Sequence, residues 1–122
     1  MAWNLNSDRP ICIQIVERIE MDIISGKYKP GDKLPSVRDL AAEAAVNPNT
    51  MQKAFTELER TGLVFSQRTT GRFITEDTSM IDELKSTLAK DKITELLSFM
   101  QQLGFQENEI LAMIGQTMKG EK

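Results

Sequence analysis

Side chains that hydrogen-bond nucleic acids or carry positive charge are concentrated in the middle of this chain. Amides and hydroxyls can bond to base edges and phosphates, whereas lysine and arginine bind phosphate, and arginine also reads guanine. A glycine among them allows the backbone to approach a ligand closely. Side chains of these types are suited to contact double-stranded DNA where the fold brings them together. The candidate residues are Ser36, Arg38, Asn47, Asn49, Thr50, Gln52, Lys53, Arg68, Thr70, Gly71 and Arg72.

Few residues of this chain are suited to catalysis or metal binding. The chain contains no histidine and one cysteine, so metal sites and Cys/His nucleophiles lack the partners they need. Carboxylate or lysine catalysis remains formally possible, but a chain of 122 residues leaves little room for an enclosed pocket. We therefore predict a protein that is not an enzyme and uses no cofactor or metal. Cys12 lies on an apolar helical stripe, where a thiol acts as a small hydrophobic group.

The net charge of -3 conceals an uneven distribution. Residues 27–75 contain eight basic and five acidic side chains, while the segments on either side are both net negative. A surface that faces a polyanion must therefore lie in the middle segment. The excess is small, so on charge alone these residues can also be a solvated surface. Lys27, Lys29 and Lys33 form a basic cluster that we interpret as solvated.

Length and hydropathy limit the class of protein. The chain fits one compact domain with a modest extension. Its apolar runs are far shorter than the roughly 18 to 20 residues that cross a bilayer, and its N-terminus lacks the pattern of a signal peptide. We expect a soluble cytoplasmic protein without a membrane partner.

The elements around the candidate residues have clear end signals. A first helix begins near Arg9 or Pro10 and ends at Gly26. Ser36 and Asn47 are predicted to cap two further helices, over 36–44 and 47–61. The pattern then predicts strands over 63–67 and 72–75, joined by a glycine-containing turn. Two short helices with a tight link and a following hairpin form a winged helix-turn-helix, whose second helix enters the major groove.

The tail contains a second apolar pattern. A polar stretch at 76–79 suggests a boundary, giving domains 1–77 and 78–122. Ser79 is expected to cap a helix that extends to Leu103, with a break possible near 89–92, and a last helix covers 106–118. Two helices cover their own apolar faces poorly, so we expect a homodimer. The predicted fold class is mainly α with a small β-hairpin: an N-terminal winged helix-turn-helix plus a C-terminal helical dimerisation tail.

One signature with fixed spacing extends through the predicted helices and the hairpin. It consists of Ile19, Ile23 and Gly26, the run Pro30-Gly31-Asp32-Lys33-Leu34-Pro35-Ser36-Val37-Arg38-Asp39-Leu40-Ala41, then Val46-Asn47-Pro48-Asn49-Thr50, Ala54, Leu58, Gly62-Leu63 and Gly71-Arg72-Phe73-Ile74. By this signature, residues 10–75 resemble the DNA-binding domain of the GntR family of bacterial transcription regulators. The family commonly has glycine before Val46 and serine or threonine after it, where this chain has Ala45 and Asn47. The tail resembles that of the YtrA subfamily.

The resemblance implies a specific function. It implies a homodimeric repressor that binds a pseudo-palindromic DNA operator, in a group often found beside genes for ABC-type transporters. It also implies that the tail serves dimerisation, and it leaves the identity of any small-molecule effector open. The alternative is a winged-helix module that binds proteins without specific DNA binding. The residues that the GntR resemblance implies as contacts with operator DNA are Arg38, Asn49, Thr50, Gln52, Thr70 and Gly71.

Overall fold

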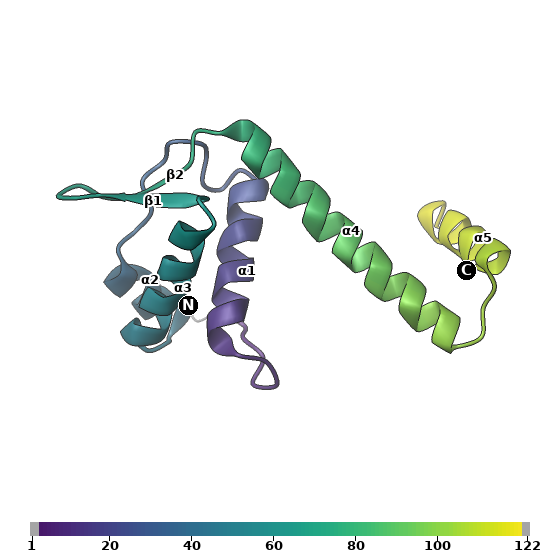
Figure 1. Cartoon of the computed structure of the whole chain (residues 1–122). Helices are drawn as coiled ribbons and strands as arrows, with labels where there is room; N and C mark the ends of the chain where they lie inside the picture. Colours follow the sequence, from purple (N-terminus) through teal and green to yellow (C-terminus); the bar gives the residue numbers. More distant parts are fainter. Residues whose placement is uncertain (1–2, 121–122) are drawn as a thin grey trace. The chain divides into compact units, whose positions relative to one another are not determined.

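The computed structural model describes residues 3–120, so residues 1–2 and 121–122 of the two predicted domains lie outside the described residues. The described chain is mainly helical, with one antiparallel hairpin after the second and third helices (Figure 1). It divides into two compact units, Met1–Glu83 and Leu84–Lys122. The elements are α1 (Ile11–Ile24), α2 (Val37–Ala44), α3 (Pro48–Arg60), β1 (Val64–Gln67), β2 (Gly71–Ile74), α4 (Thr78–Gln102) and α5 (Glu107–Met118).

The core of the first unit lies where α1, α2 and α3 meet. The apolar stripes of these helices face one another, which confirms the predicted helical periodicity. The N-terminal segment adds Trp3, which is buried and whose indole Nε1 donates a hydrogen bond to Glu43 at 2.9 Å. The largest fully buried side chains are Phe55, Ile15, Ile19, Leu40, Met51, Leu58, Ile74 and Val64.

Both predicted caps of the helix-turn-helix are confirmed. Ser36 Oγ accepts a hydrogen bond from the backbone N–H of Asp39 at 3.0 Å, and Asn47 Oδ1 accepts one from Asn49 at 2.7 Å. Between the two helices the backbone of Ala45 is left-handed, with φ 59 and ψ 47. This conformation turns the chain sharply and fixes the start of α3 close to α2.

The wing is a two-stranded sheet with an additional backbone contact. β1 pairs with β2 in a register that runs from Val64 opposite Ile74 to Gln67 opposite Gly71. The segment before α2 also joins β2, through an antiparallel bridge between Lys33 and Phe73. The hairpin was predicted, whereas this additional bridge was not.

The sequence left open whether the helix that follows the wing is broken near 89–92, and in the structure α4 is continuous there. Its cap is Asp77 rather than Ser79: Asp77 Oδ1 accepts from the Ser79 N–H at 3.1 Å and from the Met80 N–H at 3.3 Å. The hydrogen bond from the Ser79 hydroxyl is the main cause that lowers the Asp77 pKa. The first six residues of α4 belong to the first unit, which extends to Glu83, and the domain boundary predicted at 77/78 stays a prediction.

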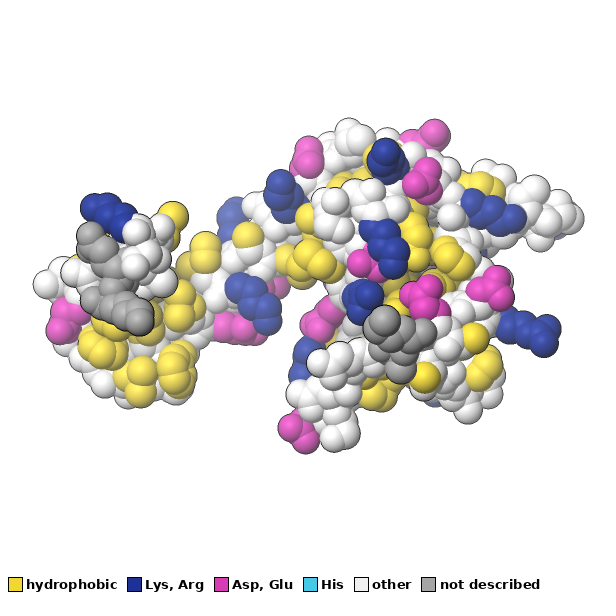
Figure 2. Space-filling view, turned by 180° about the vertical axis from the view of Figure 1, so that it is seen from behind, with side chains coloured by type: hydrophobic (Ala, Val, Ile, Leu, Met, Phe, Trp, Pro, Cys, Tyr) yellow, Lys and Arg dark blue, Asp and Glu magenta, His cyan; other side chains and the backbone are white. Residues whose placement is uncertain are grey.

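The second unit leaves most of its apolar side chains in contact with solvent. Met100 and Ile110 are buried within the described part of this unit. Figure 2 shows hydrophobic side chains gathered on the visible face of this unit. None of the helices in the described range has the length and apolar character of a membrane span. The large exposed apolar residues of this unit are Ile93, Leu96, Leu97, Phe99, Leu103, Leu111, Met113 and Met118.

Candidate nucleic-acid interface

A groove of about 790 Å³ lies between the start of α2, the outer face of α3 and the wing. Six of the predicted residues line it, contributed by segments far apart in the sequence. Such a convergence of hydrogen-bonding and basic side chains around α3 is the arrangement with which a winged helix holds DNA. These six residues are Ser36, Arg38, Gln52, Thr70, Gly71 and Arg72.

Arg38 is the basic side chain that α2 brings to this groove. It lies in the first turn of the helix, directly after the Ser36 cap, and its side chain is exposed. Within the described part of the chain it forms no ion pair. A guanidinium with five donors and no internal partner is available for two parallel hydrogen bonds to guanine or phosphate.

The outer face of α3 is polar and mostly uncharged. Asn49, Gln52 and Lys53 are exposed, while the opposite face is buried in the core. Gln52 Nε2 lies 3.4 Å from Thr56 Oγ1, a long contact that leaves the amide ready to exchange partners. Asn47 and Thr50 lie apart from the groove, in a separate hollow of about 410 Å³ beside the N-terminal segment.

Lys53 has acidic surroundings. It lines a hollow of about 410 Å³ together with Glu17, Glu20 and Glu57. Burial raises the pKa of Glu20, with smaller contributions from the charges of Glu17 and Glu57. The positive charge of Lys53 is therefore partly offset by its neighbours, in contrast to that of Arg38.

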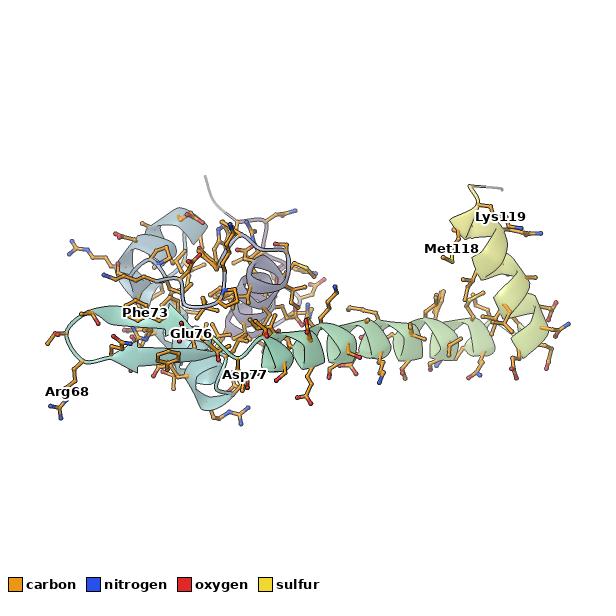
Figure 3. The ribbon with its side chains drawn as sticks, turned by 90° about the horizontal axis from the view of Figure 1, so that it is seen from above. Arg68, Phe73, Glu76, Asp77, Met118 and Lys119 are labelled. Carbon is orange, nitrogen blue, oxygen red and sulfur yellow. The ribbon has the colours of Figure 1, made fainter. Side chains whose placement is uncertain are left out.

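Arg68 and Thr70 belong to the turn of the wing. Arg68 projects away from the tip of the hairpin (Figure 3) and is exposed. The Thr70 N–H donates to the Gln67 carbonyl at 3.2 Å, which closes the turn. Gly71 has φ +115, a conformation that L side chains rarely adopt. The wing thus presents a defined turn with a cation at its tip.

Arg72 has a different environment from the other predicted cations. Its Nε donates to Glu59 Oε1 at 2.5 Å, and its guanidinium lies 5.1 Å from the centre of the Phe55 ring. One quarter of the side chain is exposed. Both partners belong to α3, so Arg72 connects β2 with the candidate recognition helix.

Among the groove residues that were not predicted, two can donate a hydrogen bond to phosphate through their side chains. These two residues are Lys33 and Thr69. Lys33 was interpreted as part of a solvated cluster, because nothing in its local sequence indicates the bridge to Phe73. Groups of three or more histidine, cysteine or acidic residues able to hold a metal ion do not occur among residues 3–120.

Comparison with known proteins agrees with this geometry. The family model described as "Bacterial regulatory proteins, gntR family" matches residues 13–74, which contain α2, α3, the wing and most of α1. The chain belongs to the GntR family. It is a DNA-binding winged helix-turn-helix transcription regulator rather than an enzyme.

Relatives of this GntR regulator match nearly its full length. The Bacillus subtilis regulator YhcF is 39% identical over 111 residues, with 91% of this chain and 92% of YhcF covered. The repressor YtrA of the same organism is 41% identical over 97 residues, with 80% and 70% covered. These matches extend beyond the winged helix into the tail, so the chain is close to YhcF and YtrA in its sequence as well as in its size.

Solved structures support the same fold. A GntR-family regulator from Listeria monocytogenes has a TM-score of 0.87 and 39% identity, with 92% of this chain and 98% of that chain covered. The DNA-binding domain of AraR in complex with the operator ORX1 has a TM-score of 0.53 and 29% identity, with 62% and 92% covered. The first structure confirms the predicted fold, including the wing and the C-terminal helices.

Proposed function

We propose that this GntR regulator is a repressor that binds a pseudo-palindromic operator as a homodimer. The observation that carries the proposal is the groove of about 790 Å³ in which Arg38, Gln52 and the wing meet. Its chemistry suits a DNA edge, because it combines an unpaired guanidinium, an amide and exposed backbone near a glycine.

Each part of the interface has a separate role in this proposal. α3 lies in the major groove, where Asn49, Thr50 and Gln52 contact base edges or nearby phosphates. Arg38 reads guanine or binds phosphate from the start of α2. Ser36 and Asn47 act mainly through the caps that fix the two helices, and their backbone lies beside the phosphates. Lys53, Arg68, Thr70 and Gly71 contact the DNA backbone.

The second unit supports the proposed homodimer. Eight large apolar side chains are exposed there, while two are buried in its described part. Exposed apolar side chains in such number favour a partner that covers them, and a second copy supplies a matching face under two-fold symmetry. Two recognition helices then meet half-sites about 34 Å apart, one turn of the double helix.

The sign of regulation is proposed from a relative. YtrA of Bacillus subtilis, which is 41% identical over 97 residues, is described as a repressor, and we assign the same sign to this chain. A transporter operon as the target is proposed from the resemblance of the tail to the YtrA subfamily. The regulator acts in the cytoplasm, on the DNA upstream of the regulated genes.

A footprint of the purified protein on DNA upstream of its own gene tests the proposal. We expect two protected half-sites related by a dyad and separated by about one helical turn. Arg38→Ala is expected to need roughly 5- to 150-fold more protein than the wild type for the same protection, the equivalent of about 1 to 3 kcal/mol. Arg60→Ala is the matched control, because Arg60 is an exposed arginine of α3 that pairs with Glu57 outside the groove.

Three outcomes contradict parts of the proposal separately. Uniform protection of all DNA refutes sequence-specific binding and leaves a winged-helix module that recruits proteins. A single unpaired half-site refutes the dimeric arrangement. A promoter fusion whose transcription falls when the gene is deleted refutes the role as a repressor.

A further inference from the structure

The wing is attached to the segment before α2 by backbone hydrogen bonds. The Leu34 N–H donates to the Arg72 carbonyl at 2.8 Å, and the Ile74 N–H donates to the Asp32 carbonyl at 2.8 Å. Lys33 lies between these two bonds and forms the bridge with Phe73. The backbone of Lys33 is therefore held in register with β2, and the residue moves together with the wing.

The side chain of Lys33 crosses the end of the wing turn. A Cβ atom added to Gly71 would lie 2.9 Å from Lys33 Cε and 3.7 Å from Nζ. The ammonium group thus lies next to the backbone where β2 begins, on the wall of the groove. Lys33 is exposed and, within the described residues, forms no ion pair. Its backbone is held by the hydrogen bonds on either side, and its ammonium group has no acidic partner among residues 3–120.

Arg72, the next cation along this wall, is already neutralised. Its Nε donates to Glu59 at 2.5 Å, and its guanidinium faces the Phe55 ring at 5.1 Å. Breaking this pair would leave a half-buried carboxylate next to an incoming phosphate, which opposes DNA binding. Both of these side-chain contacts connect Arg72 to α3 and fix β2 against that helix.

We propose that Lys33 is a phosphate-binding residue of the DNA interface and that Arg72 is a positioning residue, whose pair with Glu59 sets the wing against the recognition helix. The proposal rests on the proposed function, because it assigns roles within the same groove. The sequence predicted Arg72 as a DNA contact on this wall of the groove. The proposal assigns the phosphate contact there to Lys33, which lies outside the hairpin. Gly71 has a second role here, since a side chain would displace Lys33.

The test of Lys33 is the salt dependence of DNA affinity. The full-length protein is titrated by fluorescence anisotropy against the duplex defined by the footprint and against a scrambled duplex. Lys33→Ala is expected to reduce the slope of log affinity against log salt by about 0.9, one phosphate contact. Between about 50 and 200 mM salt, its affinity then falls roughly 3.5-fold less than that of the wild type.

Two controls accompany this variant. Lys33→Arg keeps the charge and is expected to restore the slope. Lys29→Ala removes a neighbouring exposed lysine that does not line the groove, and it is expected to leave the slope unchanged. An unchanged slope in Lys33→Ala, or the same loss in Lys29→Ala, overturns the assignment of Lys33.

The test of Arg72 is a charge reversal of its pair. Arg72→Glu places two carboxylates together and is expected to weaken binding at least 10-fold by displacing the wing. The double variant Arg72→Glu with Glu59→Arg rebuilds the pair in the opposite direction and is expected to recover affinity to within a few-fold. If Arg72 contacts phosphate itself, the double variant keeps a carboxylate at that contact and binds as poorly as Arg72→Glu.

The wild-type measurement distinguishes a failure of the proposed function from a failure of the roles assigned to Lys33 and Arg72. A wild type with no salt dependence, or with no preference for the footprinted duplex, refutes the proposed function. A wild type that shows both, with variants that depart from the expected pattern, refutes the roles of Lys33 and Arg72 alone. Thermal melts of each variant identify any loss of affinity that is due to unfolding.

Discussion

Ala45→Gly tests the turn between α2 and α3, on which the placement of the recognition helix depends. Ala45 has φ 59 and ψ 47, and it is the one non-glycine residue with positive φ in the described chain. An L residue in this region costs roughly 1 to 2 kcal/mol relative to the right-handed region. Glycine removes that cost but adds unfolded-state entropy, which opposes folding by about 0.4 to 1 kcal/mol.

The remaining contacts of Ala45 do not alter this balance. Its side chain is exposed, so removing the methyl group opens no cavity in the core. Its N–H contacts the carbonyl groups of Ala41 and Ala42, and glycine retains both. We therefore expect Ala45→Gly to stabilise the protein by about 0.5 to 1 kcal/mol, from the difference of the two terms. The melting temperature then rises by roughly 2 to 4 °C for a chain of this length.

Calorimetric or circular-dichroism melts at one protein concentration measure this change, with Ala42→Gly as the control. Ala42 is an exposed residue inside α2, in right-handed conformation. Glycine at that position is expected to destabilise by about 1 kcal/mol. If both substitutions lower the melting temperature equally, the left-handed turn is refuted, and with it the placement of α3 against α2.

Three further predictions concern charge, assembly and specificity. Burial and two carboxylates raise the pKa of Glu20, so its ionised form opposes folding above the raised pKa, and this penalty disappears below its ordinary value of 4.5. Glu20→Gln is therefore expected to raise the melting temperature near pH 7 and to lose this advantage in acid; equal gains at both pH values contradict the shift. A chain truncated after Glu83 is expected to be a monomer by light scattering while the full chain is a dimer; a full-length monomer at micromolar concentration excludes the proposed assembly. Arg38→Ala is expected to cost about 1 to 3 kcal/mol on operator DNA, measured by anisotropy. The loss on scrambled DNA is expected to be smaller, and equal losses would make Arg38 a phosphate contact.

The helix-turn-helix was predictable because its signals are local. Asn47 and Pro48 specify the start of α3, and Gly62 specifies its end, so the predicted bounds 47–61 lie within one residue of Pro48–Arg60. A capping side chain bonds to a backbone N–H two or three residues further along the chain, so the residue types alone predict where the helix begins. The cap of α4 was misplaced because Asp77 and Ser79 both suit that position, and Asp77 accepts the hydrogen bonds.

Two further features that sequence reasoning missed depend on contacts between distant segments. The bridge between Lys33 and Phe73 joins residues on opposite sides of the helix-turn-helix. The pair between Arg72 and Glu59 forms because β2 returns beside α3, and the sequence alone does not select Glu59 among the nearby acids. Each contact changes the role that we assign to a basic residue. Arg72, which was predicted to bind DNA, is paired with Glu59, while Lys33 is exposed and lines the groove.

The most direct test of the account is the ratio of two dissociation constants. Fluorescence anisotropy at physiological ionic strength measures binding of the full-length protein to the duplex upstream of its own gene and to a scrambled duplex of equal length. A sequence-specific regulator is expected to bind the first at least about 10³-fold more tightly. A ratio near one would contradict the central claim that the groove between α2, α3 and the wing reads DNA sequence.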